Sequence, residues 1–392
     1  MLNTPFSPWP SYTSEEIRSV SEVLASNRVN YWTGDVCRRF EQAFANYVGA
    51  QHAVALANGT LALDVALKAL KVGPGDEVVV TPRTFMASVS TVVTAGAIPV
   101  FADVDRDTQN ISAETIARVL SPRTKAIIPV HLAGMPCDMD PIMSLAREHD
   151  LFVIEDCAQA HGATYKGHNV GTIGHVGAWS FCQDKIMTTG GEGGMVTTND
   201  WALWSSMWSY KDHGKSWEAV YTRQHPPGPR LVHDSFGTNW RMLEMQGAIG
   251  LVQLGLMPQW KSRRTEIALT ITSHLQKHAV VRAPSIPDYA EHAYYRLYAF
   301  VEPEYLGSGW SRDRIIDEIV ARGVPCMHGS QSEVYLERAF DGTGWCPAER
   351  LSVARELGET GLAFLVHPTL TAAEVNKTCS VIDEVLSAAS RP

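Results

Sequence analysis

The stretch from about residue 60 to residue 155 alternates short apolar segments with amphipathic ones. The apolar segments have the length of buried strands, and between them apolar residues recur at helical spacing. We therefore expect strands at 77–81, 98–101, 126–130 and 151–155, and helices at 60–71, 88–95, 113–120 and 140–148. This alternation predicts an α/β fold in which a mostly parallel central sheet lies between helices.

The flanking regions add further elements. A capping-box pattern at 13–16 predicts the start of a first helix, and a second helix is expected over 38–47. Residues 179–198 contain two strand-like pieces around a glycine-rich stretch. The segment 211–238 is polar and rich in Gly and Pro, so we expect a long loop there.

The pattern changes again near the C-terminal third of the chain. Helices are expected over 241–256 and 265–279, and the change after Trp260 indicates a second domain. We expect a large domain over 1–256 and a smaller C-terminal α+β domain over 257–392.

Composition and charge exclude several classes of protein. The chain has 392 residues, of which 45% are hydrophobic and 19% charged, so it can bury a large core and disorder is not expected. Its net charge of −9 argues against a nucleic-acid partner, and it has no apolar run long enough to span a membrane. The seven cysteines are widely spaced, and no secretion signal precedes them. We therefore expect a cytoplasmic protein without structural metal or disulfides.

Residues that directly follow the predicted strands are the candidates for a binding site, because ligands of parallel sheets collect at the carboxyl ends of the strands. Asn58, Gly59 and Thr60 open a predicted helix. Backbone N–H groups at a helix start suit a phosphate, and a glycine lets it approach closely. An ordinary glycine turn with Thr60 as the helix cap is the alternative.

Asp156 directly follows the strand at 151–155, and Gln159 comes three residues later. A carboxylate at this position can hydrogen-bond the protonated ring nitrogen of pyridoxal 5′-phosphate (PLP). The alternative is that Asp156 caps a helix and touches no ligand.

Lys185 follows a predicted strand and lies in a segment with few other charges. A partly buried lysine can form a Schiff base, whereas most lysines are solvated surface residues. Ser180 offers a hydroxyl to a phosphate, and the ring of Phe85 can stack on a planar cofactor or simply pack. Phosphate loop, stacking ring, carboxylate and lysine together form the set that a PLP site requires.

The chain resembles the DegT/StrS family of PLP-dependent nucleotide-sugar aminotransferases. The resemblance runs over nearly the whole chain, and the EDCAQAHG and SF…K…GGEGG blocks are highly specific. The matching stretches are 57–67, 81–88, 153–167, 179–200, 236–254 and 323–340. The family has the PLP-dependent transferase fold type I, so the resemblance implies a large PLP-binding domain and a small C-terminal domain.

The resemblance also implies roles for individual residues. Lys185 would carry PLP as an internal aldimine, Asp156 would pair with the ring nitrogen, and Gln159 would contact the ring hydroxyl. Asn239 would reach the phosphate of the partner chain, which implies a homodimer with shared active sites, and His328 would line the substrate cleft. The cofactor's phosphate and ring would be held by Gly59, Thr60, Ser180 and Phe85.

The reaction implied by the resemblance is amination of a keto sugar linked to a nucleotide diphosphate, with L-glutamate as the amino donor. A free keto-cyclitol is an alternative acceptor. A PLP-dependent sugar dehydratase is a further alternative, but those relatives replace the lysine by histidine, so Lys185 argues against it. Ala133 stands where relatives often carry an aromatic residue, which leaves the identity of the sugar open.

Overall fold

A seven-stranded sheet forms the centre of the computed structural model, which describes residue 2 and residues 4–391. Only β9 runs antiparallel to its neighbours, so the mostly parallel sheet expected from the sequence is confirmed. The strand order is β1 (His52–Leu56), β9 (Gly194–Thr198), β8 (Val176–Ser180), β5 (Phe152–Asp156), β4 (Thr124–Ile128), β2 (Glu77–Val80) and β3 (Ile98–Phe101).

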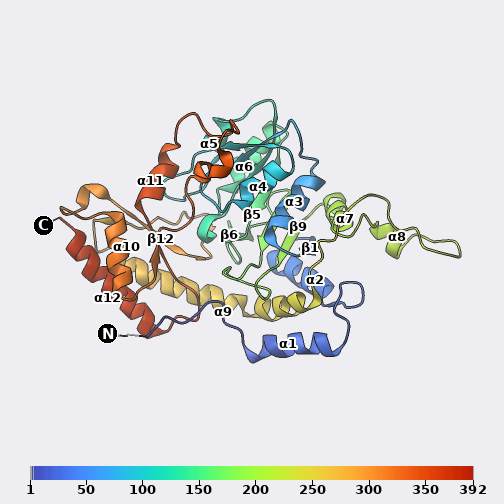
Figure 1. Cartoon of the computed structure of the whole chain (residues 1–392), viewed down its shortest axis with the longest axis horizontal. Helices are drawn as coiled ribbons and strands as arrows, with labels where there is room; N and C mark the ends of the chain where they lie inside the picture. Colours follow the sequence, from blue (N-terminus) through green and yellow to red (C-terminus); the bar gives the residue numbers. More distant parts are fainter. Residues whose placement is uncertain (1, 3, 392) are drawn as a thin grey trace.

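Helices cover both faces of this sheet (Figure 1). Side chains alternate between the faces along each strand. In β1, Val54 and Leu56 belong to one core and Ala53 and Ala55 to the other. The first face packs on α3 (Gly59–Ala69), α4 (Ala87–Thr94) and α7 (Trp201–Tyr210). The second packs on α2 (Val36–Val48), α5 (Ala113–Ala117), α6 (Met139–Glu148) and α9 (Glu244–Leu275).

The predicted strands and helices between residues 60 and 155 agree with the structure to within a few residues. The capping box of α1 (Ser14–Ala25) is also present, since the Glu16 carboxylate accepts a hydrogen bond of 2.9 Å from the Thr13 N–H and the Thr13 hydroxyl accepts one from the Glu15 N–H. Strand β1 was not expected, because its sequence HAVAL is short and rich in Ala.

A four-stranded antiparallel sheet forms the centre of the C-terminal part. A separate core joins it to α9 and to helices α10 (Arg312–Ala321) and α12 (Ala372–Ala389). Its strands, in order, are β10 (Val281–Arg282), β12 (Leu297–Val301), β14 (Gly361–Phe364) and β13 (Cys326–Met327). The remaining elements are β6 (Thr164–Tyr165), β7 (His168–Asn169), β11 (Ala290–Glu291), α8 (Trp217–Tyr221), α11 (Ser352–Thr360), η1 (Leu132–Gly134), η2 (Pro303–Tyr305), η3 (Val334–Leu336) and η4 (Arg338–Phe340).

Helix α9 runs along both parts of the molecule as one element of 32 residues (Figure 1). The prediction of two helices, over 241–256 and 265–279, is therefore wrong. Pro258 removes one backbone hydrogen bond, but packing against both cores maintains the helix through it. The domain division at 256/257 falls inside α9 and stays a prediction. No helix in the described part of the chain, α9 included, is long and apolar enough to cross a membrane.

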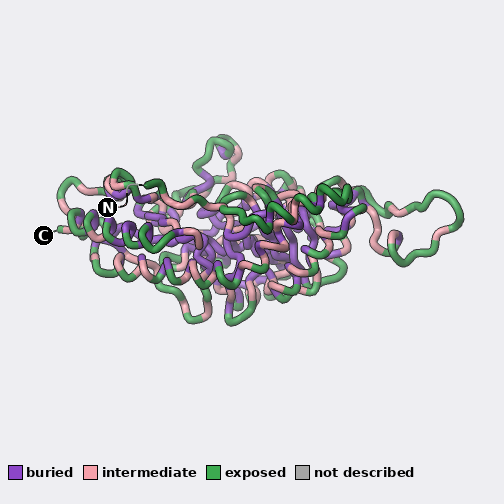
Figure 2. The backbone as a smooth tube through the Cα atoms, turned by 90° about the horizontal axis from the view of Figure 1, so that it is seen from below, coloured by how far each residue is buried: buried purple, intermediate pink, exposed green. Residues whose placement is uncertain are grey.

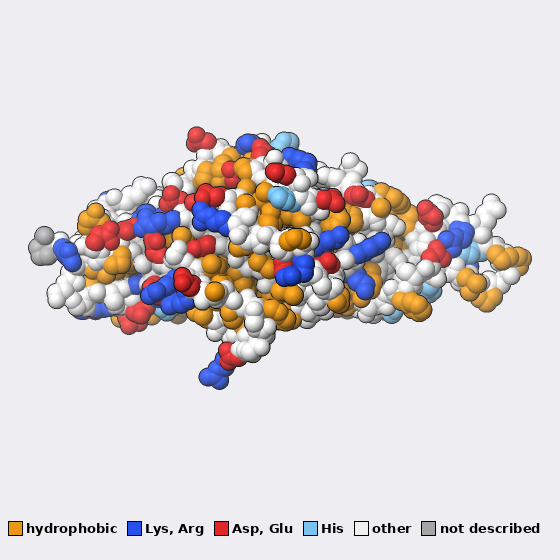
Figure 3. Space-filling view, turned by 90° about the horizontal axis from the view of Figure 1, so that it is seen from above, with side chains coloured by type: hydrophobic (Ala, Val, Ile, Leu, Met, Phe, Trp, Pro, Cys, Tyr) orange, Lys and Arg blue, Asp and Glu red, His pale blue; other side chains and the backbone are white. Residues whose placement is uncertain are grey.

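The expected loop at 211–238 is present and extends away from the body of the protein (Figures 1 and 2). It contains one short helix, α8. Phe236 is 99% exposed and Leu231 80% exposed within this loop. Figure 3 shows hydrophobic side chains gathered at the tip of the protrusion. Such exposure of large apolar side chains is typical of a surface that another protein covers.

Candidate active site

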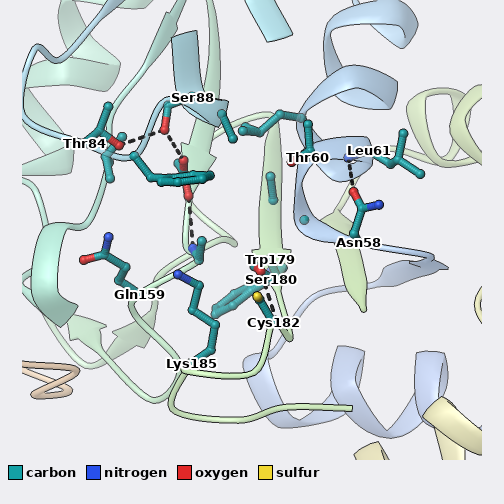
Figure 4. A pocket seen from close by; sticks show the side chains of 18 of the residues that line it. Asn58, Thr60, Leu61, Thr84, Ser88, Gln159, Trp179, Ser180, Cys182 and Lys185 are labelled. Atoms are coloured by element: carbon teal, nitrogen blue, oxygen red, sulfur yellow. Dashed lines mark hydrogen bonds between the residues drawn. The ribbon is translucent and has the colours of Figure 1, made fainter. Parts of the chain in front are cut away.

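A cavity of about 610 Å³ lies where β5 and β8 end and α3 begins (Figure 4). The parallel strands place the residues that follow them at one edge of the sheet, so positions far apart in the chain meet here. Seven of the residues expected from the sequence line this cavity: Gly59, Thr60, Phe85, Asp156, Gln159, Ser180 and Lys185.

The first turn of α3 forms one wall of the cavity. Asn58 caps this helix through a hydrogen bond of 3.0 Å from the Leu61 N–H to its Oδ1, so the cap is Asn58 and not Thr60. A Cβ atom on Gly59 would lie only 2.5 Å from Cβ of Ser180. Only glycine therefore lets the helix start lie against the end of β8, where the Ser180 hydroxyl faces the same cavity. Helix N–H groups and a hydroxyl at one place are suited to a phosphate.

Asp156 is buried at the end of β5, with 5% of its surface exposed. Its Oδ2 accepts a hydrogen bond of 2.7 Å from the Ser88 hydroxyl, and its Oδ1 accepts one of 3.1 Å from the Ala158 N–H. The Ser88 hydroxyl in turn lies 2.8 Å from that of Thr84 (Figure 4). No helix begins at Asp156, so it is a carboxylate held in the cavity wall and not a helix cap.

Lys185 lies in the loop after β8, and 14% of its side chain is exposed. Its Nζ is 3.8 Å from Oδ1 of Asp184 and 5.1 Å from the centre of the Tyr295 ring. The Tyr295 hydroxyl donates a hydrogen bond to the other oxygen of Asp184. The carbonyl oxygen of Lys185 accepts a hydrogen bond of 2.8 Å from the indole N–H of Trp9. Both the backbone and the amine of this lysine are thus positioned by residues distant in the sequence.

The carboxyl group of Asp184 remains ionised in this environment. Burial would raise its pKa, but Lys185 and the Tyr295 hydroxyl lower the pKa below its ordinary value. Asp184 therefore presents a negative charge beside the lysine amine at neutral pH.

Gln159 and Phe85 complete the cavity. The side-chain oxygen of Gln159 accepts a hydrogen bond of 2.8 Å from the Ala133 N–H in η1, which leaves its amide N–H groups for a ligand. Phe85 lines the cavity with 67% of its surface exposed, so a ring face is accessible to a planar molecule.

The structure does not bring Asn239 and His328 into this cavity. Asn239 is exposed, and its side chain accepts only a long hydrogen bond of 3.4 Å, from the Arg241 N–H. The His328 ring points to Asp313, with Nε2 3.3 Å from Oδ1. Its neighbours Met327 and Gly329 line a neighbouring cavity.

That neighbouring cavity has a volume of about 440 Å³ and adjoins the first. The two cavities share five residues, Thr84, Phe85, Gln159, Asp184 and Lys185. Its other walls include Tyr295, Arg296 and Tyr298, which come from the segment leading into β12 and from β12 itself. These three residues were not expected from the sequence, since their approach depends on how the C-terminal part packs on the sheet.

One buried group has the spacing of metal ligands, formed by His131, Glu155 and Cys157. Both imidazole nitrogens of His131 are engaged, one 3.0 Å from Glu155 and the other 3.0 Å from the Cys137 N–H. The carboxylate of Glu155 also accepts backbone hydrogen bonds from Gly171, Ile173 and Gly174. Because these lone pairs already have donors, the group is a hydrogen-bonded network and is not suited to hold a metal.

Comparisons with known proteins agree with this geometry. The chain matches the DegT/DnrJ/EryC1/StrS aminotransferase family over residues 10–383. A GDP-perosamine synthase of Caulobacter vibrioides is 38% identical over 365 residues, which cover 91% of this chain and 92% of the relative. The solved aminotransferase from Psychrobacter cryohalolentis is 60% identical over 98% of this chain and 100% of its own, with a TM-score of 0.97. The structure of S. venezuelae DesV is 30% identical over 98% and 99% of the two chains, with a TM-score of 0.87.

PLP suits the residues of the larger cavity. The cofactor needs a phosphate site, a carboxylate for its ring nitrogen and a lysine amine, and α3 with Ser180, Asp156 and Lys185 offer these groups. Gly59, Thr60 and Ser180 form the wall suited to the phosphate (the phosphate wall), and glycine is needed at position 59 because a Cβ there would lie 2.5 Å from Cβ of Ser180. This protein is a PLP-dependent aminotransferase and belongs to the DegT/DnrJ/EryC1/StrS aminotransferase family.

Proposed function

We propose that the protein converts a keto sugar carried on a nucleoside diphosphate into the corresponding amino sugar, with L-glutamate as the amino donor. The observation that carries this proposal is the convergence of Lys185, Asp156 and the phosphate wall on one cavity. The name of the Caulobacter relative, GDP-perosamine synthase, supports a nucleotide-linked sugar as the acceptor. A cytoplasmic location is part of the proposal, since all seven cysteines are free thiols.

Different residues of the cavity would bind different parts of the cofactor. The backbone of Gly59 and the hydroxyls of Thr60 and Ser180 would bind its phosphate. Gln159 would donate to its ring hydroxyl, and Phe85 would stack on its ring. PLP supplies an electron sink that stabilises negative charge on the carbon bearing the amino group.

Asp156 and Lys185 would take part in the reaction itself. Asp156 would accept a hydrogen bond from the ring N–H and keep that nitrogen protonated, because Ser88 and Ala158 hold the carboxylate in place. The Lys185 amine would take a proton from the carbon that carries the donor's amino group and deliver one to the acceptor carbon. Limited exposure of Lys185 keeps this proton from exchanging freely with water.

The assay that tests this function supplies L-glutamate and a panel of keto sugars linked to GDP, UDP or dTDP. We expect an amino sugar and 2-oxoglutarate in equal amounts from at least one nucleotide-linked sugar, measured by mass spectrometry and by a coupled 2-oxoglutarate assay. A free keto-cyclitol serves as the comparison acceptor. Turnover of the cyclitol alone would contradict the proposed substrate class and leave the aminotransferase activity intact.

We also propose a homodimer in which Asn239 completes the active site of the partner chain. Asn239 is exposed and lies outside its own chain's cavity, at the base of the loop that carries the exposed Phe236 and Leu231. A second copy that covers this loop would bury these side chains and bring Asn239 near the partner's phosphate wall.

Mixing two inactive variants tests the shared site. Lys185→Ala and Asn239→Ala should each have little activity alone, whereas mixed dimers contain one site with both native residues. After co-refolding or co-expression we expect activity to return to about a quarter of the wild-type value, on the assumption of random pairing of the two variants. Light scattering gives the oligomeric state in parallel. Mixed dimers with no restored activity would contradict the role of Asn239, and a monomer would contradict the dimer itself.

A further inference from the structure

Arg296 has unused bonding capacity in the wall of the 440 Å³ cavity. Within the described part of the chain, its guanidinium has neither an ion-pair partner nor a hydrogen-bond acceptor. It lies against the ring of Tyr295, whose centre is 5.0 Å from the guanidinium carbon. A half-buried guanidinium with five free N–H donors is suited to bind a planar anion.

A second, buried arginine interacts with Arg296 through its charge. Arg264 is 1% exposed, and its Nη1 donates a hydrogen bond of 3.2 Å to the Tyr294 carbonyl. Its Nε and Nη2 have no hydrogen-bond partner among residues 2 and 4–391. Burial and the charge of Arg296 lower the pKa of Arg264 to about 9. Burial and these two arginines lower the pKa of His367 to about 4, so this histidine adds no charge at neutral pH. An anion bound beside Arg296 would therefore be stabilised.

The negative groups of the cavity do not neutralise Arg296. Asp184 is already engaged by the Tyr295 hydroxyl and lies beside Lys185. Glu337 is exposed to solvent, where water and salt screen its charge. Two cations and two anions line the cavity, and Arg296 contributes to the lowered pKa of Asp184, but among the described residues no carboxylate lies within ion-pair distance of the Arg296 guanidinium.

We propose that Arg296 binds a carboxylate of the amino-acid donor, an inference that rests on the proposed function. In an α-amino acid the carboxylate and the amine share one carbon, and Lys185 must reach that carbon to move its proton. The carboxylate must therefore lie in the space next to Lys185, and the cavity that adjoins this lysine contains Arg296. A guanidinium can donate two parallel hydrogen bonds to one carboxylate, which fixes the donor's orientation.

Arg296→Gln tests this assignment in the half-reaction with L-glutamate. We expect the glutamate concentration for half-maximal conversion of the PLP spectrum to rise about 10- to 100-fold, the loss typical of a charge-assisted hydrogen bond. The rate at saturating glutamate should fall by a smaller factor than this concentration rises. Arg296→Lys should recover part of the loss, because it restores the charge without the planar fork. Arg118→Gln removes an exposed charge directly after α5 and serves as the control.

Calorimetric binding of 2-oxoglutarate to the PLP-free protein gives a readout that is independent of turnover. We expect wild type to bind it and Arg296→Gln to bind it at least tenfold more weakly. Equal glutamate dependence of wild type and Arg296→Gln would overturn the assignment while leaving the proposed function standing. Weaker inhibition by GDP, with unchanged glutamate dependence, would assign the guanidinium to a diphosphate and also overturn it. A wild-type protein that transfers no amine at all would remove the proposed function and this inference together.

Discussion

Lys185→Ala is expected to lower kcat for amine transfer by at least about 10⁴-fold, the upper end of what a positioned acid–base group contributes. The variant loses the amine that moves the proton, and no other lysine lines either cavity. The fold should persist, because the side chain lies in the wall of a cavity and its amine forms no hydrogen bond within the described residues. Steady-state kinetics measure the loss, and thermal unfolding of variant and wild type measures the stability.

Borohydride reduction followed by peptide mass spectrometry gives a second readout for the same variant. We expect the pyridoxyl group on the peptide containing Lys185 in wild type and no labelled peptide in the variant. Lys166→Ala is the matched control, since Lys166 is an exposed lysine paired with Asp140. Wild-type turnover in Lys185→Ala, or labelling of another lysine, would refute the assigned role.

Asp156→Asn is expected to lower kcat by about 10²- to 10³-fold, as the removal of one preorganised electrostatic group typically does. The amide keeps the size of the carboxylate and can still hydrogen-bond Ser88 and the Ala158 N–H, so the cavity wall should be preserved. It cannot hold a positive charge on the ring nitrogen, and the electron sink is weakened. The variant should therefore still bind PLP and show its visible absorbance, with slow turnover.

Ser88→Ala separates the charge of Asp156 from its hydrogen bonding. This variant removes the 2.7 Å hydrogen bond to Oδ2 of Asp156 but retains the carboxylate, so we expect kcat to fall tenfold or less. A smaller loss in Asp156→Asn than in Ser88→Ala would contradict the role of the negative charge. Loss of PLP binding in Asp156→Asn would instead make the residue a structural support of the cofactor site.

The sheet and the cofactor cavity could be predicted because both depend on local patterns. Strand-length apolar segments, and polar residues directly after them, are visible in the sequence, and the parallel topology then brings Asp156, Ser180 and Gly59 to one edge. Ser88 and Thr84 lie in the 81–88 block that resembles the family, and their hydroxyl groups after a strand were the signal that could have identified them.

The second cavity could not be predicted in the same way. The residues that approach Lys185 or its cavity come from segments distant in the sequence: Trp9 from the N-terminal segment, and Tyr295 and Arg296 from the C-terminal part. Their positions therefore follow from packing between distant segments. The length of helix α9 also depends on packing between distant segments and could not be predicted from the local sequence. A proline and a change of hydrophobic pattern suggested two helices, whereas contacts with two cores maintain one.

Helix α9 has a mechanical consequence for the enzyme. Its N-terminal half packs against the core that contains Trp179. Its C-terminal half packs into the core of the C-terminal part. The two halves of the molecule are therefore joined by a rod instead of a flexible linker, and they cannot rotate apart without bending it. Bending is least costly at Pro258, because the hydrogen bond that would resist it there is already missing. The position of Arg296 relative to Asp156 therefore depends on this helix together with direct contacts between the two parts, such as the hydrogen bond of 2.8 Å from the Tyr295 N–H to the Ala133 carbonyl.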